Sequence, residues 1–191
     1  DVKFDTLPLT AQNDFLPDYA ALSDDVKQRA KLMYLNYPNN PTGGVATSEF
    51  FNETVQFAKD NNIAVAHDFA YGAIGFDGNR PPSFLQADGA KDIGIELYTL
   101  SKSFNMAGWR IGFAVGNAKM IEAINIIQDH LFCSQFPAIQ MAAATALNDE
   151  QACVENLRAL YESRRNVLVE EARKIGWHIT APKGSFFAWL P

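Results

Sequence analysis

Apolar and polar positions alternate in blocks along the first part of the chain, and the apolar blocks have the length of β-strands. Four of them are bounded by turn-forming residues, and together they cover residues 32–36, 63–66, 95–100 and 111–115. A weaker run at residues 3–9 predicts a fifth strand. The pattern therefore predicts a sheet built from short strands.

A helical pattern separates the first two strands. Between residues 48 and 61 the apolar side chains recur at helical spacing, and Thr47 or Ser48 can cap the N-terminus. Strand, helix and strand at this spacing predict a βαβ unit with parallel strands. The connection at 102–110 is too short for a helical crossover, so the strand at 111–115 is expected to run antiparallel to the strand before it.

After Gly116 the pattern becomes helical and then returns to strand spacing. The predicted elements are helices at 118–130, 137–148 and 150–174, followed by a hairpin of strands at 177–180 and 185–190. The order predicts an α/β fold with a three-layer, mostly parallel sheet and one antiparallel strand, plus the start of a smaller α+β domain.

This order also predicts two incomplete domains. Residues 1–149 would form the core of the larger domain, without its N-terminal side. Residues 150–191 would form a connecting helix and the first hairpin of the smaller domain. The chain opens on Asp1 rather than Met and closes directly after an apolar run, so we expect a piece of a longer protein.

Composition removes several classes of function. The 191 residues are 48% hydrophobic and carry a net charge of −6, which is typical of a globular protein and argues against a nucleic-acid-binding surface. No apolar stretch is long enough to span a bilayer, so no membrane partner is expected. Cys133 and Cys153 lie far apart with no metal-ligand spacing, which predicts free thiols, no metal site and a cytoplasmic location.

Polar side chains of the kinds that bind ligands or take part in reactions lie next to the predicted strands. Asn40 follows the first strand, Asp68 and Tyr71 follow the second, and Lys102 follows the third, while Arg110 precedes the fourth. Ligands of open α/β sheets bind at the carboxyl ends of the strands. We therefore expect these five side chains to meet at one edge of the sheet.

Each of the five residues also has a purely structural interpretation. An Asn before Pro is commonly a turn former, an Asp after a strand commonly caps a helix, and a lone Lys is commonly a solvated surface group. A Tyr can simply pack, and an Arg can form an ion pair. The set carries more weight than its members because all five are expected at the same edge.

The five side chains match the parts of one cofactor. A reactive lysine amine suits an aldehyde, and a carboxylate suits a protonated ring nitrogen. The Asn40 amide and the Tyr71 hydroxyl can donate to a phenolic oxygen, while Arg110 with the Thr99, Ser101 and Ser103 hydroxyls suits a phosphate. Pyridoxal phosphate has all of these groups.

At these residues the chain resembles the class I/II aminotransferases, which are pyridoxal-phosphate enzymes of fold type I. The resemblance runs over essentially the whole chain and is sharpest at residues 40–43, 68–71 and 99–112, in that order. It implies that Lys102 is the Schiff-base lysine that also moves the substrate proton, and that Asp68 pairs with the pyridine nitrogen.

The resemblance assigns the remaining residues as well. It implies that Asn40 and Tyr71 contact the phenolic oxygen, that Asn40 also contacts the substrate carboxylate, and that Arg110 binds the phosphate. Thr99 stands where the family has Ser or Gly, and its hydroxyl can still reach the phosphate. The family's Gly-rich phosphate loop, its ring-stacking aromatic and its substrate-carboxylate arginine have no counterpart in the chain.

The resemblance implies transamination between an amino acid and a 2-oxo acid in a homodimeric enzyme. The scaffold looks most like transaminases for apolar or sulfur-containing 2-oxo acids, such as the methionine-salvage type. Two alternatives stay open: a carbon–sulfur β-lyase of the same fold, and a catalytically incomplete fragment. A nucleotide-binding α/β domain is disfavoured because the chain has neither GxGxxG nor a P-loop.

Overall fold

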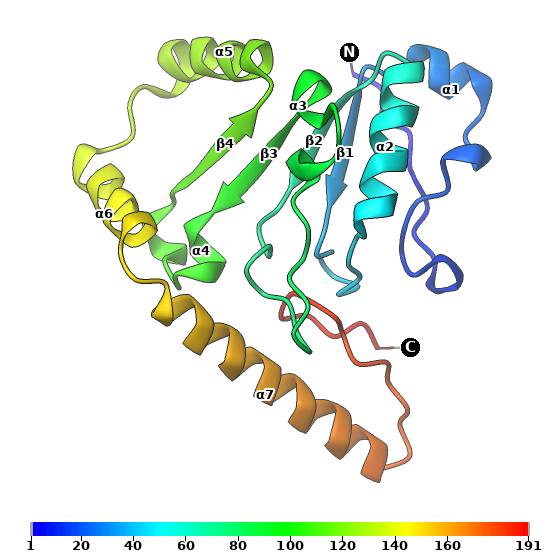
Figure 1. Ribbon diagram of the computed structural model, residues 1–191, viewed down its shortest axis with the longest axis vertical. Helices are drawn as coiled ribbons and strands as arrows, with labels where there is room; N and C mark the ends of the chain where they lie inside the picture. Colours follow the sequence, from blue (N-terminus) through cyan, green and yellow to red (C-terminus); the bar gives the residue numbers. More distant parts are fainter. Residues whose placement is uncertain (1, 191) are drawn as a thin grey trace.

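The centre of the molecule is a four-stranded sheet, seen in a computed structural model that describes residues 2–190 (Figure 1). The first three strands are parallel, and the fourth runs antiparallel to the third. This confirms the mixed, mostly parallel α/β sheet, with its antiparallel pair at the expected place. In spatial order the strands are β1 (Leu32–Asn36), β2 (Ala64–Asp68), β3 (Gly94–Thr99) and β4 (Gly112–Gly116).

Helix α2 (Ser48–Asp60) covers one face of β1 and β2. The Thr47 hydroxyl accepts a hydrogen bond from the Phe50 amide at 3.1 Å, which confirms the predicted cap. Phe51 and Val55 of the helix are buried in the same cluster as Val65 of β2. The predicted βαβ unit is therefore present, and burial of its apolar helix face holds it together.

Short helices line the connections. The α-helices are α1 (Asp24–Arg29), α3 (Ala90–Ile93) and α4 (Leu100–Ser103), and the 3₁₀ helices are η1 (Ala11–Asn13), η2 (Tyr19–Ala21), η3 (Phe84–Gln86) and η4 (Ala107–Trp109). Helix α4 matters most for the site because it follows β3 directly and carries Lys102. Its residue Leu100 is buried in the protein and anchors the turn.

The second half of the chain is helical, as predicted. It contains α5 (Ala118–Ile127), the π-helical turn η5 (Gln128–Phe132), α6 (Pro137–Asn148) and the long helix α7 (Ala152–Lys174). The bounds of α6 agree with the prediction, and Pro137 occupies its first turn. Helix α5 ends earlier than predicted because the backbone changes there from α-helical to π-helical hydrogen bonding.

Two predicted strand regions are not strands. Residues 3–9 form no strand, and Phe4 is 90% exposed, so this run has no sheet partner among the described residues. The hairpin predicted at 177–180 and 185–190 is also wrong, since the segment contains only a single bridge between Gly75 and Gly184. A hairpin alone is marginally stable in water, and this one has no further strand of the described chain to extend it.

The C-terminal segment instead packs on the loop that follows β2. The Ser185 amide donates to the Ile74 carbonyl at 2.8 Å, and the Phe76 amide donates to the Lys183 carbonyl at 3.1 Å. Its aromatic residue Phe186 is thereby brought next to the carboxyl ends of the strands.

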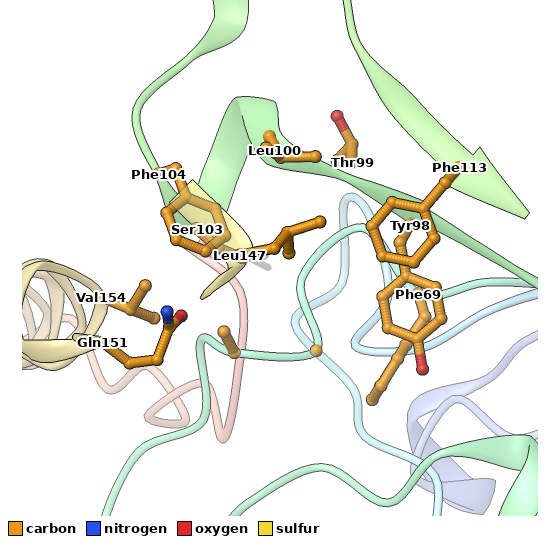
Figure 2. A pocket seen from close by; sticks show the side chains of 12 residues that line it. Phe69, Tyr98, Thr99, Leu100, Ser103, Phe104, Phe113, Leu147, Gln151 and Val154 are labelled. Atoms are coloured by element: carbon orange, nitrogen blue, oxygen red, sulfur yellow. The ribbon is translucent and has the colours of Figure 1, made fainter. Parts of the chain in front are cut away.

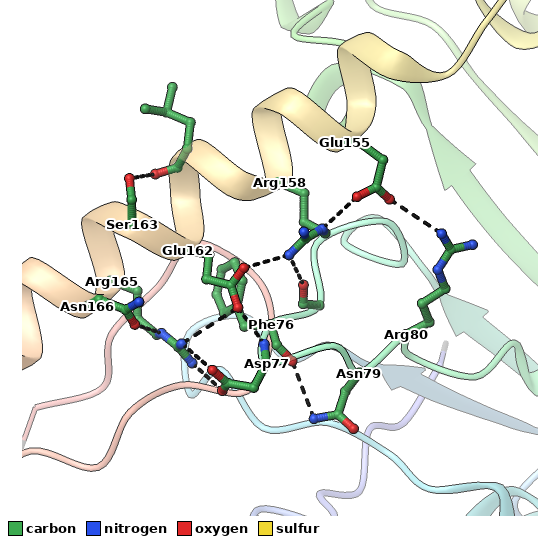
Figure 3. Close-up of polar contacts among 12 residues, drawn as sticks. Phe76, Asp77, Asn79, Arg80, Glu155, Arg158, Glu162, Ser163, Arg165 and Asn166 are labelled. Atoms are coloured by element: carbon green, nitrogen blue, oxygen red, sulfur yellow. Dashed lines mark hydrogen bonds and ion pairs between the residues drawn. The ribbon is translucent and has the colours of Figure 1, made fainter.

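Ion pairs attach helix α7 to the same loop (Figure 3). The guanidinium of Arg165 donates two hydrogen bonds to the Asp77 carboxylate, at 2.6 and 2.7 Å, and a third to the Pro182 carbonyl at 3.0 Å. It also lies 4.9 Å from the centre of the Phe76 ring. Two turns earlier in the helix, Arg158 pairs with Glu162 at 2.7 Å. The loop, the helix and the C-terminal segment are therefore joined through one buried arginine.

None of the helices within residues 2–190 combines the length and the apolar character that crossing a bilayer requires.

Candidate functional site

Asn40 lies in a tight loop directly after β1. The Asn36 side-chain oxygen accepts a hydrogen bond from the backbone N–H of Asn40 at 2.8 Å. The backbone N–H of Asn39 closes the loop by donating to the Gly44 carbonyl, also at 2.8 Å. Both Tyr37–Pro38 and Asn40–Pro41 are cis peptides. The loop is thus tied to the strand end, and Asn40 has the position predicted for it.

Asp68 is the last residue of β2, next to Asn36 of β1 in the parallel register. Its Oδ1 accepts from the Ala70 amide at 3.1 Å, and its Oδ2 accepts from the Tyr34 hydroxyl at 3.0 Å. The Asn36 amide also donates to the Asp68 carbonyl at 3.0 Å. The carboxylate is therefore held at the end of β2 by the backbone that follows it and by Tyr34 of the neighbouring strand β1.

Tyr71 is buried close to Asn40 and Asp68. Burial raises the pKa of the Tyr71 hydroxyl and the negative charge of Asp68 adds to this, whereas a hydrogen bond with the Asn40 side chain acts in the opposite direction. The phenol therefore stays protonated at neutral pH and is available as a donor. The three residues Asn40, Asp68 and Tyr71 meet as predicted.

Lys102 reaches the same place from helix α4. Its ammonium lies 5.9 Å from the centre of the Tyr71 ring and 5.3 Å from that of Phe186. The helix begins at a Thr99 cap, whose hydroxyl accepts from the Ser101 amide at 3.1 Å. Buried Leu100 fixes the turn, so Lys102 is presented towards the aromatic rings.

Thr99 and Arg110, the two residues expected at the phosphate, contact mainly backbone. The Thr99 hydroxyl also donates to the Ile111 carbonyl at 3.4 Å, across the β3–β4 junction. The Arg110 side chain is exposed and donates to the Ala107 carbonyl at 3.0 Å. Within the described residues, Arg110 makes no hydrogen bond or ion pair with the side chains of Asn40, Asp68, Tyr71 or Lys102.

Three residues of the site were not predicted. Tyr34 and Asn36 support Asp68 and Asn40 from β1, and Phe186 faces Tyr71 at 5.3 Å between ring centres, nearly perpendicular to it. Asn36 had a recognisable signal, because a polar residue ends an apolar strand there. Phe186 had none, since its approach depends on a segment that lies far along the chain.

A second carboxylate, Glu96, lies on the opposite face of the sheet and is fully buried. Its Oε1 accepts from His67 Nδ1 and from the Phe84 amide, both at 2.7 Å, and its Oε2 accepts from the Ser83 and Tyr98 hydroxyls. Burial acts to raise the pKa of Glu96, but the donated hydrogen bonds outweigh it and hold the pKa below the ordinary value.

A cavity of about 180 Å³ lies beside α4, whose residues Leu100 and Ser103 help to line it (Figure 2). Phe69, Tyr98 and Phe113 line one wall, and Gln151 and Val154 at the start of α7 line the other. The lining is mostly apolar and includes none of the residues Asn40, Asp68, Tyr71 and Lys102. Thr99 is the one predicted cofactor-binding residue in its lining, so the cavity adjoins the polar cluster at the strand ends without containing its other members.

A comparison with protein families identifies the group to which the sequence is related. The model of the family described as "Aminotransferase class I and II" matches residues 1–191. The chain belongs to the class I and II aminotransferases. Members of this family use pyridoxal phosphate, so the family assignment agrees with the cofactor implied by the sequence.

Two named aminotransferases are similar over nearly the whole chain. The L-glutamine–4-(methylsulfanyl)-2-oxobutanoate aminotransferase of Bacillus subtilis (strain 168) is 64% identical over 189 residues, which are 99% of this chain and 48% of that protein. An LL-diaminopimelate aminotransferase of Dehalococcoides mccartyi is 52% identical over 185 residues, which are 97% of this chain and 48% of that protein. The chain spans about half the length of these relatives.

Solved aminotransferase structures have the same fold. The apo structure of BacF from Bacillus subtilis matches with a TM-score of 0.93 and 48% identity, covering 96% of this chain and 47% of BacF. An aminotransferase from Staphylococcus aureus matches with a TM-score of 0.88 and 41% identity over 92% of this chain and 46% of that one.

Proposed function

We propose that this chain supplies the main cofactor-binding residues of a pyridoxal-phosphate-dependent aminotransferase. The observation that carries the proposal is the meeting of Asn40, Asp68, Tyr71 and Lys102 at the carboxyl ends of the parallel strands. Because the chain spans about half the length of its relatives, the activity is proposed for the whole protein.

The chemistry of the donor set fits the cofactor. When bound, pyridoxal phosphate supplies an aldehyde that reacts with a primary amine and a ring that withdraws electrons from the substrate. Lys102 provides the amine, and Asp68 provides a carboxylate for the protonated ring nitrogen. Asn40 and Tyr71 provide neutral donors for the phenolic oxygen. Thr99 and Arg110 are proposed to bind the phosphate.

The proposed reaction requires proton movement by the chain's own residues. Lys102 Nζ accepts the proton from the α-carbon of the amino acid and returns one during the reverse half-reaction. Asp68 keeps the proton on the ring nitrogen throughout by its negative charge. Asn40 is also proposed to contact the substrate carboxylate. Phe186 and Tyr71 form an aromatic wall beside the amine and limit the access of water to it.

We propose that the substrates are a donor amino acid and an apolar or sulfur-containing 2-oxo acid. The support is the 64% identity to an enzyme named for L-glutamine and 4-(methylsulfanyl)-2-oxobutanoate. The aromatic side chains next to Lys102 suit an apolar or thioether chain better than a charged one.

We also propose that the whole protein is a cytoplasmic homodimer. Large apolar side chains are exposed along consecutive helices of the second half, which is typical of a surface that a partner covers. These side chains are Ile126, Ile127, Leu131, Phe132, Phe136 and Met141. Light scattering on the whole protein and on a Phe132→Asp variant would test the assembly, and an unchanged dimer in the variant would remove this surface from the interface.

The proposed domain boundary lies near residues 149 and 150. Helix α6 ends at Asn148 and α7 begins at Ala152, so the break between them supports assigning residues 1–149 to the larger domain and 150–191 to the connection and the start of the smaller one.

The direct test is cofactor binding and amino-group exchange in the whole protein. Pyridoxal phosphate is added to the wild type, to Lys102→Ala and to Lys183→Ala, a matched loss of a lysine from the neighbouring C-terminal segment. A change in the visible absorbance of the cofactor on binding to the lysine amine is expected for the wild type and Lys183→Ala, and it should be absent from Lys102→Ala.

Product analysis then separates the reaction classes. Amino transfer from glutamine to 4-(methylsulfanyl)-2-oxobutanoate is expected. Release of pyruvate and a thiol from a cysteine conjugate, without amino exchange, would replace the aminotransferase with a β-lyase. The same absorbance change in Lys102→Ala as in the wild type would contradict the assignment of the amine.

A further inference from the structure

Tyr34 makes a direct hydrogen bond to the Asp68 carboxylate. The side chains of β1 alternate, so Met33 and Leu35 point into the core while Tyr34 and Asn36 lie on the other face. In the parallel register Tyr34 is paired with Ala66 and Asn36 with Asp68. The phenol therefore reaches two residues along β2 from its own register partner, and its hydroxyl donates to Asp68 Oδ2 at 3.0 Å.

Packing does not account for the position of Tyr34. The residue is 57% exposed, whereas its neighbours Met33 and Leu35 are buried in the main core. Among the hydrogen bonds of residues 2–190, the Tyr34 hydroxyl takes part in one, and that one goes to Asp68. The polar end of the ring is thus its most specific contact.

The bonds already made leave the carboxylate able to accept one more donor. Asp68 Oδ1 receives the Ala70 amide and Oδ2 receives the Tyr34 hydroxyl. Each carboxylate oxygen has two lone pairs, so two donors orient the group and leave acceptor capacity unused. Burial raises the pKa of Tyr34 to about 12, with a contribution from Asp68, so the phenol remains a donor at neutral pH.

We propose that Tyr34 is a positioning residue that holds the Asp68 carboxylate in the orientation needed to receive the N–H of a protonated pyridine ring. The inference rests on the proposed function, because it assumes that Asp68 binds the ring nitrogen. It extends that function to a residue on the neighbouring strand that acts through Asp68 rather than on the cofactor itself.

The test compares two cofactors that differ at one ring atom. Dissociation constants are measured by absorbance titration of the whole apo-protein with pyridoxal phosphate and with its 1-deaza analogue, in which C–H replaces the ring nitrogen. The ratio of the two constants reports the contact between Asp68 and the ring nitrogen, without any measurement of activity. The proteins are the wild type, Tyr34→Phe, Asp68→Asn and Tyr98→Phe.

Tyr98→Phe is the matched control, since it also removes a hydroxyl that donates to a carboxylate, but that carboxylate is Glu96. We expect the wild type to prefer pyridoxal phosphate, and Tyr34→Phe to reduce this preference by about three- to tenfold, because a hydrogen bond to a charged group is lost. Affinity for the deaza analogue should stay unchanged in Tyr34→Phe. Tyr98→Phe should retain the full preference.

The variants separate the two levels of the proposal. If Asp68→Asn retains the preference, the assignment of Asp68 in the proposed function is wrong. If Asp68→Asn loses it and Tyr34→Phe does not, Asp68 stands and the role of Tyr34 is wrong. If Tyr34→Phe weakened the binding of pyridoxal phosphate and of the deaza analogue equally, the effect would be a general structural one, and the positioning role would be wrong.

Discussion

Asp68 and Glu96 are carboxylates on adjacent strands, yet their surroundings differ sharply. Glu96 is fully buried and receives four hydrogen bonds, from His67, Phe84, Ser83 and Tyr98. Asp68 is partly exposed at the sheet edge and receives two. One carboxylate is saturated by the protein, whereas the other keeps capacity for a further donor.

This difference distinguishes a structural carboxylate, Glu96, from the proposed binding carboxylate, Asp68. A buried charge is tolerated when its acceptor sites are filled, because each missing donor leaves a costly unpaired group. A ligand-binding carboxylate must instead be oriented and incompletely satisfied. The sheet holds both kinds of carboxylate on neighbouring strands. It can do so because the side chains of successive residues, such as His67 and Asp68, point to opposite faces.

The largest expected effect is the loss of activity in Asp68→Asn. In the whole protein this substitution removes the charge that is proposed to keep the ring nitrogen protonated, and we expect the rate of amino transfer to fall roughly 100- to 1000-fold. Stopped-flow single-turnover rates measure it. Stability should change little, because the Asn oxygen can still accept from Ala70 or Tyr34, and a large loss of stability would erase the contrast with Glu96.

The next effect is the loss of stability in Glu96→Gln. The amide places a donor group against existing donors in a dry site, so we expect a loss of about 2–4 kcal/mol in the free energy of unfolding. Denaturant titration measures this value. Asp68→Asn is the control because it also replaces a carboxylate with the corresponding amide. A cost below that of the control would show that the buried network is not what stabilises this region.

Acid should remove part of the Glu96 contribution. The folded-state pKa of Glu96 lies below its unfolded value, so its stabilisation is present above the unfolded pKa of about 4.3 and is lost as the pH falls through the folded pKa. The stability difference between wild type and Glu96→Gln should therefore be constant from about pH 6 to 8 and shrink below about pH 4. A difference that stays constant to the lowest pH would contradict the lowered pKa.

The smallest effect is expected for Tyr71→Phe. Asn40 remains as a second donor to the same proposed oxygen, so we expect the single-turnover rate of amino transfer to fall only about three- to tenfold. The comparison is made in the same single-turnover assay as Asp68→Asn. Losses of similar size in the two variants would contradict the roles assigned to the charge and to the neutral donor.

The positions of the main site residues could be predicted because they follow from strand order. Parallel strands bring their carboxyl ends to one edge, so locating the strands that end near Asn36, Asp68 and Thr99 was enough to group the polar residues behind them. The short connection before β4 likewise predicted the antiparallel pair. These arguments need only local patterns and short connections.

The missed features depend on contacts between distant segments. Tyr34 reads as an ordinary strand residue until the register with β2 places its hydroxyl near Asp68. Phe186 was assigned to a hairpin, but its segment packs on the loop around Ile74 and Phe76 instead. Strand propensity alone cannot tell whether a partner strand is available.

The central claim is that Lys102 is the amine that binds the cofactor. The most direct measurement is borohydride reduction of the whole protein loaded with pyridoxal phosphate, followed by proteolysis and mass spectrometry of the peptides. The predicted result is a phosphopyridoxyl group on the peptide that contains Lys102. The same peptide from protein that was not reduced should carry no such group. The same group on a different lysine, with Lys102 unmodified, would contradict the claim.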